Sequence, residues 1–239
     1  MNIFPEIDWV QSASVLFPDS QANGLGMTAV QDYQFPINGL LKRTMDILIT
    51  LLLGLIFLPV FLLTAMLVRL DSPGPIFYSQ QRLGKNGRKI IIYKFRSMRC
   101  NADHLLMEYL RNCPSARFEW EKTQKLRCDP RLTRVGKWIR EFSLDELPQL
   151  FNILKGDMSL VGPRPILLDQ EELYGLEINI YLMVRPGLTG FWQVSGRNHT
   201  TFFQRTLYDA YYIRNWSVWL DIIILLRTVW VVLSRDGAY

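Results

Sequence analysis

An unbroken apolar segment constrains this chain more than any other feature of its sequence. Residues 47–68 form a run of 22 residues without a charged side chain, ILITLLLGLIFLPVFLLTAMLV. As an α-helix this run would be about 33 Å long, which is enough to cross the hydrocarbon core of a bilayer. A buried core helix is the alternative, but a soluble chain of 239 residues rarely surrounds so long an apolar helix on every side. The run therefore predicts a segment that inserts into a membrane.

The flanks of this segment leave its topology open. Pro59 lies near the middle, where it removes a backbone hydrogen bond and predicts a kink that can turn a span into a re-entrant hairpin. Lys42 and Arg43 precede the run and Arg69 follows it, as expected if both ends stay cytoplasmic. A single span with the N-terminal arm outside fits equally well, because residues 69–99 hold eight basic residues and one acid. Charge alone favours neither topology.

Charge is distributed unevenly along the chain. Residues 1–41 hold four acidic residues and no Lys or Arg, so the rest of the chain carries a net charge of +9. Residues 1–40 also lack a sustained hydrophobic period, and we expect an acidic, poorly ordered arm there. We expect residues 41–69 to be the membrane segment and residues 70–239 to form a cytoplasmic domain. A basic domain of this kind can face nucleic acid, an anionic membrane surface or a phosphorylated substrate.

The cytoplasmic domain is predicted to be α/β, mostly helical, with a small β-hairpin. The stretches IFYSQQRLG and RKIIIYKFRSM flank Lys85-Asn86-Gly87, which is typical of a hairpin with an Asn-Gly turn. Residues 156–200 are rich in Gly and Pro and are expected to be mainly loop. Helical patterns cover three further stretches: residues 101–127, residues 137–154 with an internal break before Gly156, and residues 201–215.

A second apolar stretch lies near the end of the chain. Residues 218–233 include two charged side chains, and at 16 residues they are too short to cross a bilayer. Trp216, Trp219 and Trp230 suit the membrane interface, where indole rings settle. A core helix of the cytoplasmic domain fits the same pattern equally well.

Two adjacent carboxylates are the strongest candidates for catalytic residues. Asp145 and Glu146 lie in the segment Ser143-Leu-Asp-Glu-Leu-Pro-Gln-Leu150. The structural interpretation is a capping box between Ser143 and Glu146 at the start of a helix. Pro148 tolerates only the first turn, however, so the helix should begin near Leu144 or Asp145 and place both acids at its positive end. An ionised Asp there could attack phosphorus, and a neighbouring Glu could hold Mg²⁺ beside substrate phosphates.

Three arginines lie in restricted loops that could aim a guanidinium at a phosphate. Arg164 lies in Gly162-Pro-Arg-Pro165, Arg185 begins Arg185-Pro-Gly-Leu-Thr-Gly190, and Arg197 ends Ser195-Gly-Arg197. Arginine binds phosphate through paired hydrogen bonds, so the three loops together predict a pyrophosphate site.

Other sites are weakly supported. A zinc site would have to use Cys100, His104, Cys113 and Cys128, whose spacings match no standard zinc motif. The odd number of cysteines also argues against a disulfide framework. The sequence has no P-loop, no dinucleotide-binding glycine pattern and no nucleophile elbow. No recognition helix or aromatic platform is legible, so no nucleic-acid partner is expected.

Residues 39–239 contain a series of short motifs in a fixed order. The motifs are Arg43-Thr-Met-Asp46, Ser72-Pro-Gly-Pro75, Gln81-Arg-Leu-Gly84, Tyr93-Lys-Phe-Arg-Ser-Met98, Asp145-Glu-Leu-Pro-Gln149, Gly156-Asp-Met-Ser-Leu-Val-Gly-Pro-Arg-Pro165, Arg185-Pro-Gly-Leu-Thr-Gly190 and Trp216-Ser-Val-Trp-Leu-Asp221. In this order they resemble the motifs of the bacterial sugar transferases that initiate exopolysaccharide and O-antigen repeat units, the monotopic polyprenol-phosphate phosphoglycosyl transferases. The acidic arm lies outside the resemblance.

The resemblance implies a two-step chemistry. Asp145 would attack the sugar-bearing phosphate of a UDP-sugar and release UMP, and undecaprenyl phosphate would then take the sugar phosphate from the enzyme. Glu146 would hold Mg²⁺. Four basic residues match positions that line the phosphate and nucleotide site of the family, and Asp209 matches an acidic position close to it; the four are Lys94, Arg140, Arg164 and Arg197. The transferred sugar is expected to be galactose or glucose, although no residue of the sequence identifies it.

The resemblance also implies where the protein acts. It favours a re-entrant helix–break–helix at Pro59, with the catalytic domain and interfacial amphipathic helices on the cytoplasmic face of the bacterial inner membrane. Leu58 departs from relatives that carry Ser before this proline, and such a hydroxyl could satisfy a carbonyl freed at the kink. The expected partners are a UDP-sugar, undecaprenyl phosphate and membrane lipid, with a homodimer kept open. A non-catalytic membrane scaffold for polysaccharide assembly, in which both acids merely cap a helix, is the alternative function.

Overall fold

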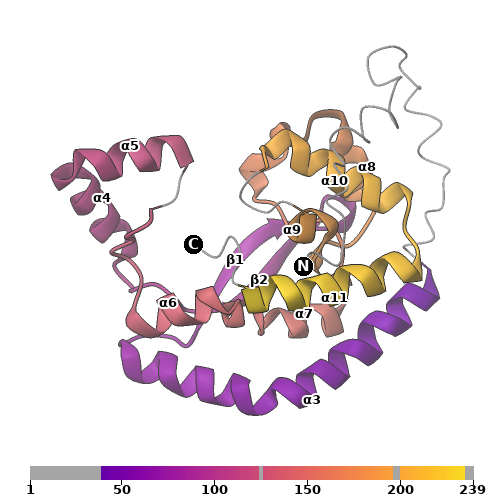
Figure 1. Ribbon diagram of the computed structural model, residues 1–239, viewed down its shortest axis with the longest axis horizontal. Helices are drawn as coiled ribbons and strands as arrows, with labels where there is room; N and C mark the ends of the chain where they lie inside the picture. Colours follow the sequence, from indigo (N-terminus) through magenta and orange to yellow (C-terminus); the bar gives the residue numbers. More distant parts are fainter. Residues whose placement is uncertain (1–38, 124–125, 196–199, 235–239) are drawn as a thin grey trace. The chain divides into compact units, whose positions relative to one another are not determined.

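The computed structural model describes residues 39–234, apart from residues 124–125 and 196–199. The expected N-terminal arm and Arg197 therefore lie outside the described residues. The described chain is mostly helical, as predicted, and it has two small sheets where a single hairpin was expected (Figure 1). One helix in this part of the chain, α3 (Leu40–Asp71), is long and apolar enough to cross a membrane.

Helix α3 is continuous over 32 residues, with Pro59 inside it. The expected helix–break–helix arrangement is therefore corrected to a single helix. Figure 1 shows that α3 bends near its middle without ending. Proline removes one helical hydrogen bond and crowds the preceding turn, and a bend relieves that crowding while the flanking hydrogen bonds are kept.

The predicted hairpin is confirmed. Strands β1 (Phe77–Leu83) and β2 (Lys89–Phe95) pair antiparallel, with Gln80 opposite Ile92. The turn is a short 3-10 segment, η2 (Lys85–Gly87), in which Asn86 and Gly87 both have positive φ angles of 57° and 71°. Asn and Gly tolerate this left-handed backbone better than other residues do, which is why the Asn-Gly signal located the turn correctly.

Residues 156–200 contain more regular structure than the predicted loop. Strands β3 (Ser159–Val161) and β4 (Gly187–Thr189) form a short parallel pair. The two backbones approach closely, because a Cβ atom on Gly187 would lie 2.2 Å from the amide nitrogen of Gly162. The glycines that suggested a loop therefore permit strand contact instead.

The helices outside residues 156–200 follow the predicted pattern, whereas α8 and α9 lie in the stretch that was expected to be mainly loop. Thr133 caps α6, and Gly156, with a φ of 96°, ends α7 as predicted. The α-helices are α4 (Ala102–Asn112), α5 (Pro114–Thr123), α6 (Arg134–Glu141), α7 (Gln149–Lys155), α8 (Ile178–Leu182), α9 (Phe191–Ser195), α10 (Phe202–Arg214) and α11 (Val218–Ser234). The further 3-10 segments are η3 (Leu144–Glu146), η4 (Leu168–Gln170) and η5 (Glu172–Glu177).

The first turns of α3 are clamped to the domain by a buried ionic network. The Nζ atom of Lys42 lies 3.1 Å from Asp46 and 2.7 Å from Asp221 on α11. Asp46 also accepts a 2.8 Å hydrogen bond from the hydroxyl of Ser159 on β3. Buried charges are tolerated only when they are paired and hydrogen-bonded, so this network sets the position of α3 against β3 and α11.

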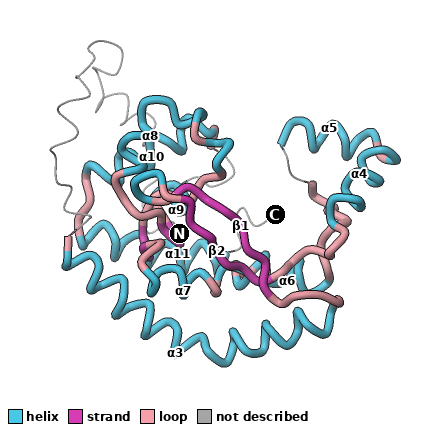
Figure 2. The backbone as a smooth tube through the Cα atoms, turned by 180° about the vertical axis from the view of Figure 1, so that it is seen from behind, coloured by secondary structure: helices cyan, strands magenta, loops and turns pink. Residues whose placement is uncertain are grey.

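The last turn of α3 is clamped to the same domain. Arg96 donates hydrogen bonds of 2.6 Å to the carbonyl of Ser72 and 2.8 Å to that of Pro73, directly after the helix. Asp71 accepts a 2.9 Å hydrogen bond from the amide of Val135 on α6. Between the two clamps, α6 and α7 lie alongside α3, as both backbone views show (Figures 1 and 2). The two ends of the apolar helix are thus held by one folded unit.

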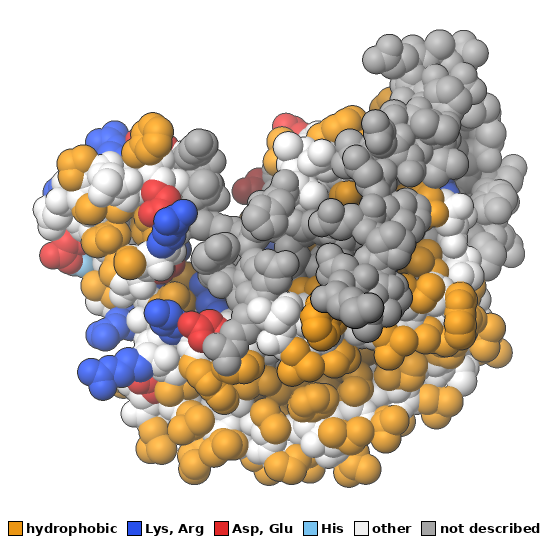
Figure 3. Space-filling model, viewed as in Figure 1, with side chains coloured by type: hydrophobic (Ala, Val, Ile, Leu, Met, Phe, Trp, Pro, Cys, Tyr) orange, Lys and Arg blue, Asp and Glu red, His pale blue; other side chains and the backbone are white. Residues whose placement is uncertain are grey.

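The other side of α3 is an exposed apolar surface. Hydrophobic side chains gather over this helix in the space-filling view (Figure 3). The exposed hydrophobic residues of α3 include Leu48, Leu51, Leu55 and Leu62. Helix α11 adds exposed apolar side chains, while its buried residues are Asp221 and Ile224. Because Trp219 and Trp230 are exposed, the pattern of α11 is that of a one-sided surface helix and not of a helix surrounded by core.

Candidate active site

The two adjacent acids lie on a tight turn between α6 and α7. Ser143 adopts the left-handed conformation with a φ of 55°, and the 3-10 turn η3 follows it at once. Ser143 makes no capping hydrogen bond through its side chain. The capping-box interpretation is therefore wrong, and the carboxylate of Glu146 is available for other partners. Pro148 directly precedes α7, as expected for a residue that tolerates only a helix start.

Lys94 on β2 connects both acids. Its Nζ atom donates a 2.6 Å hydrogen bond to Oε1 of Glu146 and lies 3.7 Å from Oδ2 of Asp145. On the other side, Nη2 of Arg164 lies 3.4 Å from the same Glu146 oxygen. The hairpin, the η3 turn and the segment after β3 thus bring four of the predicted site residues together.

The pKa values of the two carboxyl groups are shifted in opposite directions. Burial raises the pKa of Asp145 above its usual range, and the adjacent charge of Glu146 adds to the rise, against the effects of Lys94 and Arg140. For Glu146, burial is outweighed by Lys94 and Arg164, which lower its pKa to about 2. Glu146 is therefore a firmly ionised anion at neutral pH, whereas Asp145 is the more basic of the two.

Arg140 is the fifth predicted residue at this site. Its Nε atom donates a 2.8 Å hydrogen bond to the hydroxyl of Ser97, which orients the guanidinium. Burial lowers the pKa of Arg140, while the negative charge of Asp145 opposes that shift. An arginine keeps its charge under such a shift, so Arg140 adds a fixed positive charge beside Asp145.

These residues line a cleft of about 950 Å³ whose walls are strongly basic. Sequence reasoning missed several of its side chains, among them Arg82, Trp192 and Arg205. The guanidinium of Arg205 lies 4.7 Å from the ring centre of Trp192, and it donates a 3.1 Å hydrogen bond to the carbonyl of Arg164. A guanidinium over an indole ring is held in place, and its N–H donors, which lie in the guanidinium plane, can still bind an anion.

Arg82 completes a group of three guanidinium groups in the cleft. It donates a 3.3 Å hydrogen bond to the carbonyl of Pro165. Burial, followed by repulsion from Arg164 and Arg205, lowers the pKa of Arg82 to about 10. Three mutually repelling cations at one place are favourable when an anion binds between them. The motif Gln81-Arg-Leu-Gly84 was the available sequence signal for Arg82, and none identified its spatial neighbours.

Asp209 lies behind the cleft and not in its wall. It is 2% exposed, accepts a 2.7 Å hydrogen bond from the hydroxyl of Tyr174, and lies 3.9 Å from Nε of Arg205. Burial raises the pKa of Asp209 to about 6, although Arg205 and the Tyr174 hydrogen bond oppose the rise. Asp209 is therefore placed to orient Arg205 without touching a ligand itself.

One predicted phosphate-binding residue needs correction. Arg185 donates a 2.9 Å hydrogen bond to the carbonyl of Gly156 and does not line the basic cleft, because it satisfies a carbonyl at the end of α7 instead. Pro59, predicted as the kink of the membrane segment, lies inside α3, which bends without ending, and it lines neither of the two described cavities.

The cleft offers the adjacent carboxylates of Asp145 and Glu146 as possible ligands for a metal ion. Within the described residues, no group of three or more His, Cys, Asp or Glu side chains could hold one, and Cys100, Cys113 and Cys128 are free thiols. A zinc site is therefore unsupported there. Magnesium commonly uses one or two carboxylates together with substrate phosphates, and Asp145 and Glu146 fit that smaller requirement.

An apolar surface helix, clamped to a domain that carries a basic, carboxylate-bearing cleft, defines a membrane-associated protein whose site suits anionic molecules. The chain belongs to the bacterial sugar transferase family, since the model of that family matches residues 37–235.

Three relatives illustrate the range of the family. The chain is 52% identical over 199 residues to undecaprenyl-phosphate galactose phosphotransferase of Salmonella typhimurium, covering 83% of this chain and 42% of the relative. It is 46% identical over 204 residues to exopolysaccharide production protein ExoY of Sinorhizobium fredii, covering 85% and 90%. It is 39% identical over 225 residues to UDP-glucose:undecaprenyl-phosphate glucose-1-phosphate transferase of Escherichia coli, covering 90% and 45%. The chain thus spans less than half the length of the Salmonella and Escherichia relatives.

Proposed function

We propose that this protein transfers a hexose 1-phosphate from a UDP-sugar to undecaprenyl phosphate and releases UMP, as the first membrane step of exopolysaccharide repeat-unit synthesis. The observation that carries the proposal is the position of Lys94, which contacts Glu146 and lies 3.7 Å from Asp145 inside a basic cleft. The names of the Salmonella and Escherichia relatives support the same substrate classes. They also leave the hexose open between galactose and glucose.

The donor diphosphate would bind among the guanidinium groups of the cleft. Arg82, Arg164 and Arg205 supply directional donors that match phosphate oxygens, and Trp192 fixes one of them. Mg²⁺ would be held by Glu146, and when bound it supplies further positive charge against the substrate phosphates. Glu146 suits this role because its low pKa keeps it ionised.

Asp145 would act as the nucleophile. A carboxylate oxygen of Asp145 forms a bond to the phosphorus that carries the sugar, and the bond from that phosphorus to the bridging oxygen breaks, so UMP leaves with the electron pair. Lys94 and Arg140 neutralise the charge that develops on the phosphoryl oxygens. An oxygen of undecaprenyl phosphate then attacks the same phosphorus, the acyl phosphate bond breaks, and the Asp145 carboxylate is regenerated beside undecaprenyl diphosphate sugar.

The attachment of α3 supports a monotopic position on the cytoplasmic face of the inner membrane. A straight helix of 32 residues would be about 48 Å long, against about 30 Å of bilayer hydrocarbon. Since Lys42 and Arg96 clamp both ends to one domain, a straight span would require that domain to reach both membrane surfaces. A bent helix that enters one leaflet and returns avoids this. Cysteine labelling of the N-terminal arm in sealed cells tests the topology, and labelling from the periplasm contradicts it.

The activity is tested by incubating the purified protein with Mg²⁺, undecaprenyl phosphate and either UDP-galactose or UDP-glucose. We expect UMP release that depends on protein, together with a hexose-phosphate adduct on Asp145 in the intact mass when the acceptor is omitted. A protein that acts only as an assembly scaffold releases no UMP and gains no mass. Release of UMP without any adduct at Asp145 would contradict the two-step route. A homodimer remains a prediction that size measurement in detergent can test.

A further inference from the structure

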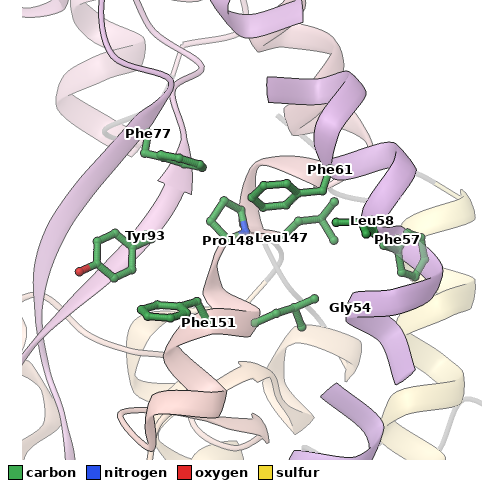
Figure 4. Close-up of a pocket in the computed structure, with 10 residues that line it drawn as sticks. Gly54, Phe57, Leu58, Phe61, Phe77, Tyr93, Leu147, Pro148 and Phe151 are labelled. Carbon is green, nitrogen blue, oxygen red and sulfur yellow. The ribbon is translucent and has the colours of Figure 1, made fainter. Parts of the chain in front are cut away.

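A second cavity of about 450 Å³ lies between α3 and the segment that follows the paired acids. Its lining comes from α3, both hairpin strands and the start of α7, and it is almost entirely apolar (Figure 4). On the side of α3, Gly54, Phe57, Leu58 and Phe61 face Leu147, Pro148 and Phe151 in Figure 4. A cavity with so little polar lining suits a hydrocarbon and offers nothing to a sugar or a nucleotide.

Aromatic rings and a missing side chain shape the cavity. Two pairs of aromatic rings line the cavity. The ring centres of Phe61 and Phe77 lie 6.1 Å apart, and those of Tyr93 and Phe151 also lie 6.1 Å apart. Gly54 lies on the helix side, and a Cβ atom added there would meet no atom within 4 Å. Glycine destabilises a helix interior, so its effect here is to leave the cavity open.

The apolar cavity adjoins the basic cleft along the chain. Tyr93 directly precedes Lys94, and Leu147 directly follows Glu146, so each wall continues into a charged residue of the site. Phe77 lines both cavities and is 45% exposed, so the two cavities share this ring at the hairpin. A molecule with a phosphate at one end and a hydrocarbon chain at the other could occupy both cavities at once.

The cavity also opens toward the apolar surface of α3. Phe57, Leu58 and Phe151 line it and are exposed, at 37%, 48% and 61%. A hydrocarbon chain could therefore enter from a bilayer without leaving an apolar environment. The neighbouring cations of Lys94 and Arg164 select an anionic head group for that chain.

We propose that this cavity seats the first isoprene units of the polyprenyl phosphate acceptor while its phosphate lies in the basic cleft. The inference rests on the proposed function and assigns acceptor binding to Gly54, Phe57, Phe61 and Phe151. It separates the hydrocarbon chain of the acceptor from the donor, because the donor is polar throughout and would use only the basic cleft. Acceptor affinity should then depend on cavity volume, and donor affinity should not.

Gly54→Leu tests this assignment, because the new side chain fills the cavity and leucine is a better helix former than glycine. With farnesyl phosphate as acceptor, we expect the KM for the acceptor to rise roughly tenfold, the loss expected from displacing part of a buried hydrocarbon chain. The KM for the UDP-sugar should change less than about twofold, since such a change is worth well under 1 kcal/mol. Gly54→Ala should give an intermediate acceptor KM.

The matched control is Leu55→Trp, which adds bulk to the next residue of α3 outside the cavity. Leu55 is 72% exposed, and its substitution should leave the KM for farnesyl phosphate unchanged. A thermal unfolding midpoint of Gly54→Leu at or above that of the wild type confirms that the variant is folded.

The outcomes are distinguishable from failure of the proposed function. If the wild-type protein forms no product from either UDP-sugar, the proposed function itself fails. If the wild type is active but Gly54→Leu keeps the acceptor KM, or raises both KM values equally, the cavity assignment is wrong. If phosphatidic acid competes with farnesyl phosphate as strongly as undecaprenyl phosphate does, the cavity takes any lipid chain and the isoprenoid assignment is overturned.

Discussion

Lys94 donates a 2.6 Å hydrogen bond to Glu146, across 52 residues of sequence. This contact ties the second strand of the hairpin to the turn that carries both acids. It also divides the roles of the acids, because the lysine and Arg164 keep Glu146 ionised while burial makes Asp145 more basic. The division provides one carboxylate suited to a cation and one suited to covalent chemistry.

Substitution of each acid should separate these roles. We expect Asp145→Asn to lower UMP release by at least about a thousandfold, because an amide cannot act as the nucleophile. Glu146→Gln should lower it by roughly a hundredfold, the size of effect seen when metal binding is weakened. Both are measured by UMP release at saturating donor. Wild-type turnover by Asp145→Asn rules out the nucleophile, and wild-type activity in EDTA rules out the metal role of Glu146.

Ser143 should contribute little as a helix cap. Its side chain makes no capping hydrogen bond, so Ser143→Ala should change the free energy of unfolding by less than about 0.5 kcal/mol. Thr133 is the matched control, since its hydroxyl accepts a 2.8 Å hydrogen bond from the amide of Gly136. Thr133→Ala should lose about 1 kcal/mol. Denaturant unfolding of both variants checks the difference, and equal losses would restore the capping interpretation.

Removal of the buried cation at the start of α3 should strongly destabilise the folded protein. Lys42→Met leaves Asp46 and Asp221 without their shared partner, and we expect a loss of about 3–5 kcal/mol in the free energy of unfolding. Lys155→Ala is the control, because its ion pair with Asp157 is half exposed and its loss should have little effect. Denaturant unfolding in detergent measures both. A Lys42→Met protein as stable as the wild type contradicts the clamp.

Asp209 should make stability depend on pH in a defined direction. Its pKa rises from 3.8 to about 6 on folding, so the unfolded chain loses this proton first as pH increases. Stability should therefore fall between about pH 4 and pH 6, by about 3 kcal/mol for a shift of this size. Asp209→Asn cannot lose a proton, and its free energy of unfolding should lack this decrease. If the free energy of unfolding has the same pH dependence in the two proteins, the pKa of Asp209 is not raised.

Asp209→Asn also tests the role of this residue behind Arg205. We expect the KM for the UDP-sugar to rise while acceptor KM is unchanged, because Asp209 contacts Arg205 and not the ligand. Equal changes in both KM values indicate a general loss of structure instead.

Local signals in the sequence were sufficient to predict several structural elements of this protein. The uncharged run located α3, the Asn-Gly turn located the hairpin, and Gly156 marked the end of α7. Each depends on side chains that act on their own backbone or on neighbours within a few residues. The adjacency of Asp145 and Glu146 is local as well, and for that reason the amino-acid sequence alone made them candidates.

Only the tertiary structure decided how distant residues meet. It placed Arg82 and Arg205 beside Arg164, turned Arg185 toward the end of α7, and left an apolar cavity at Gly54. No periodicity or turn preference encodes such contacts, because they arise from the packing of elements far apart in the chain. The same packing clamped both ends of α3 to one domain. Hydrophobicity alone identifies a membrane segment, whereas its path depends on the contacts at its ends.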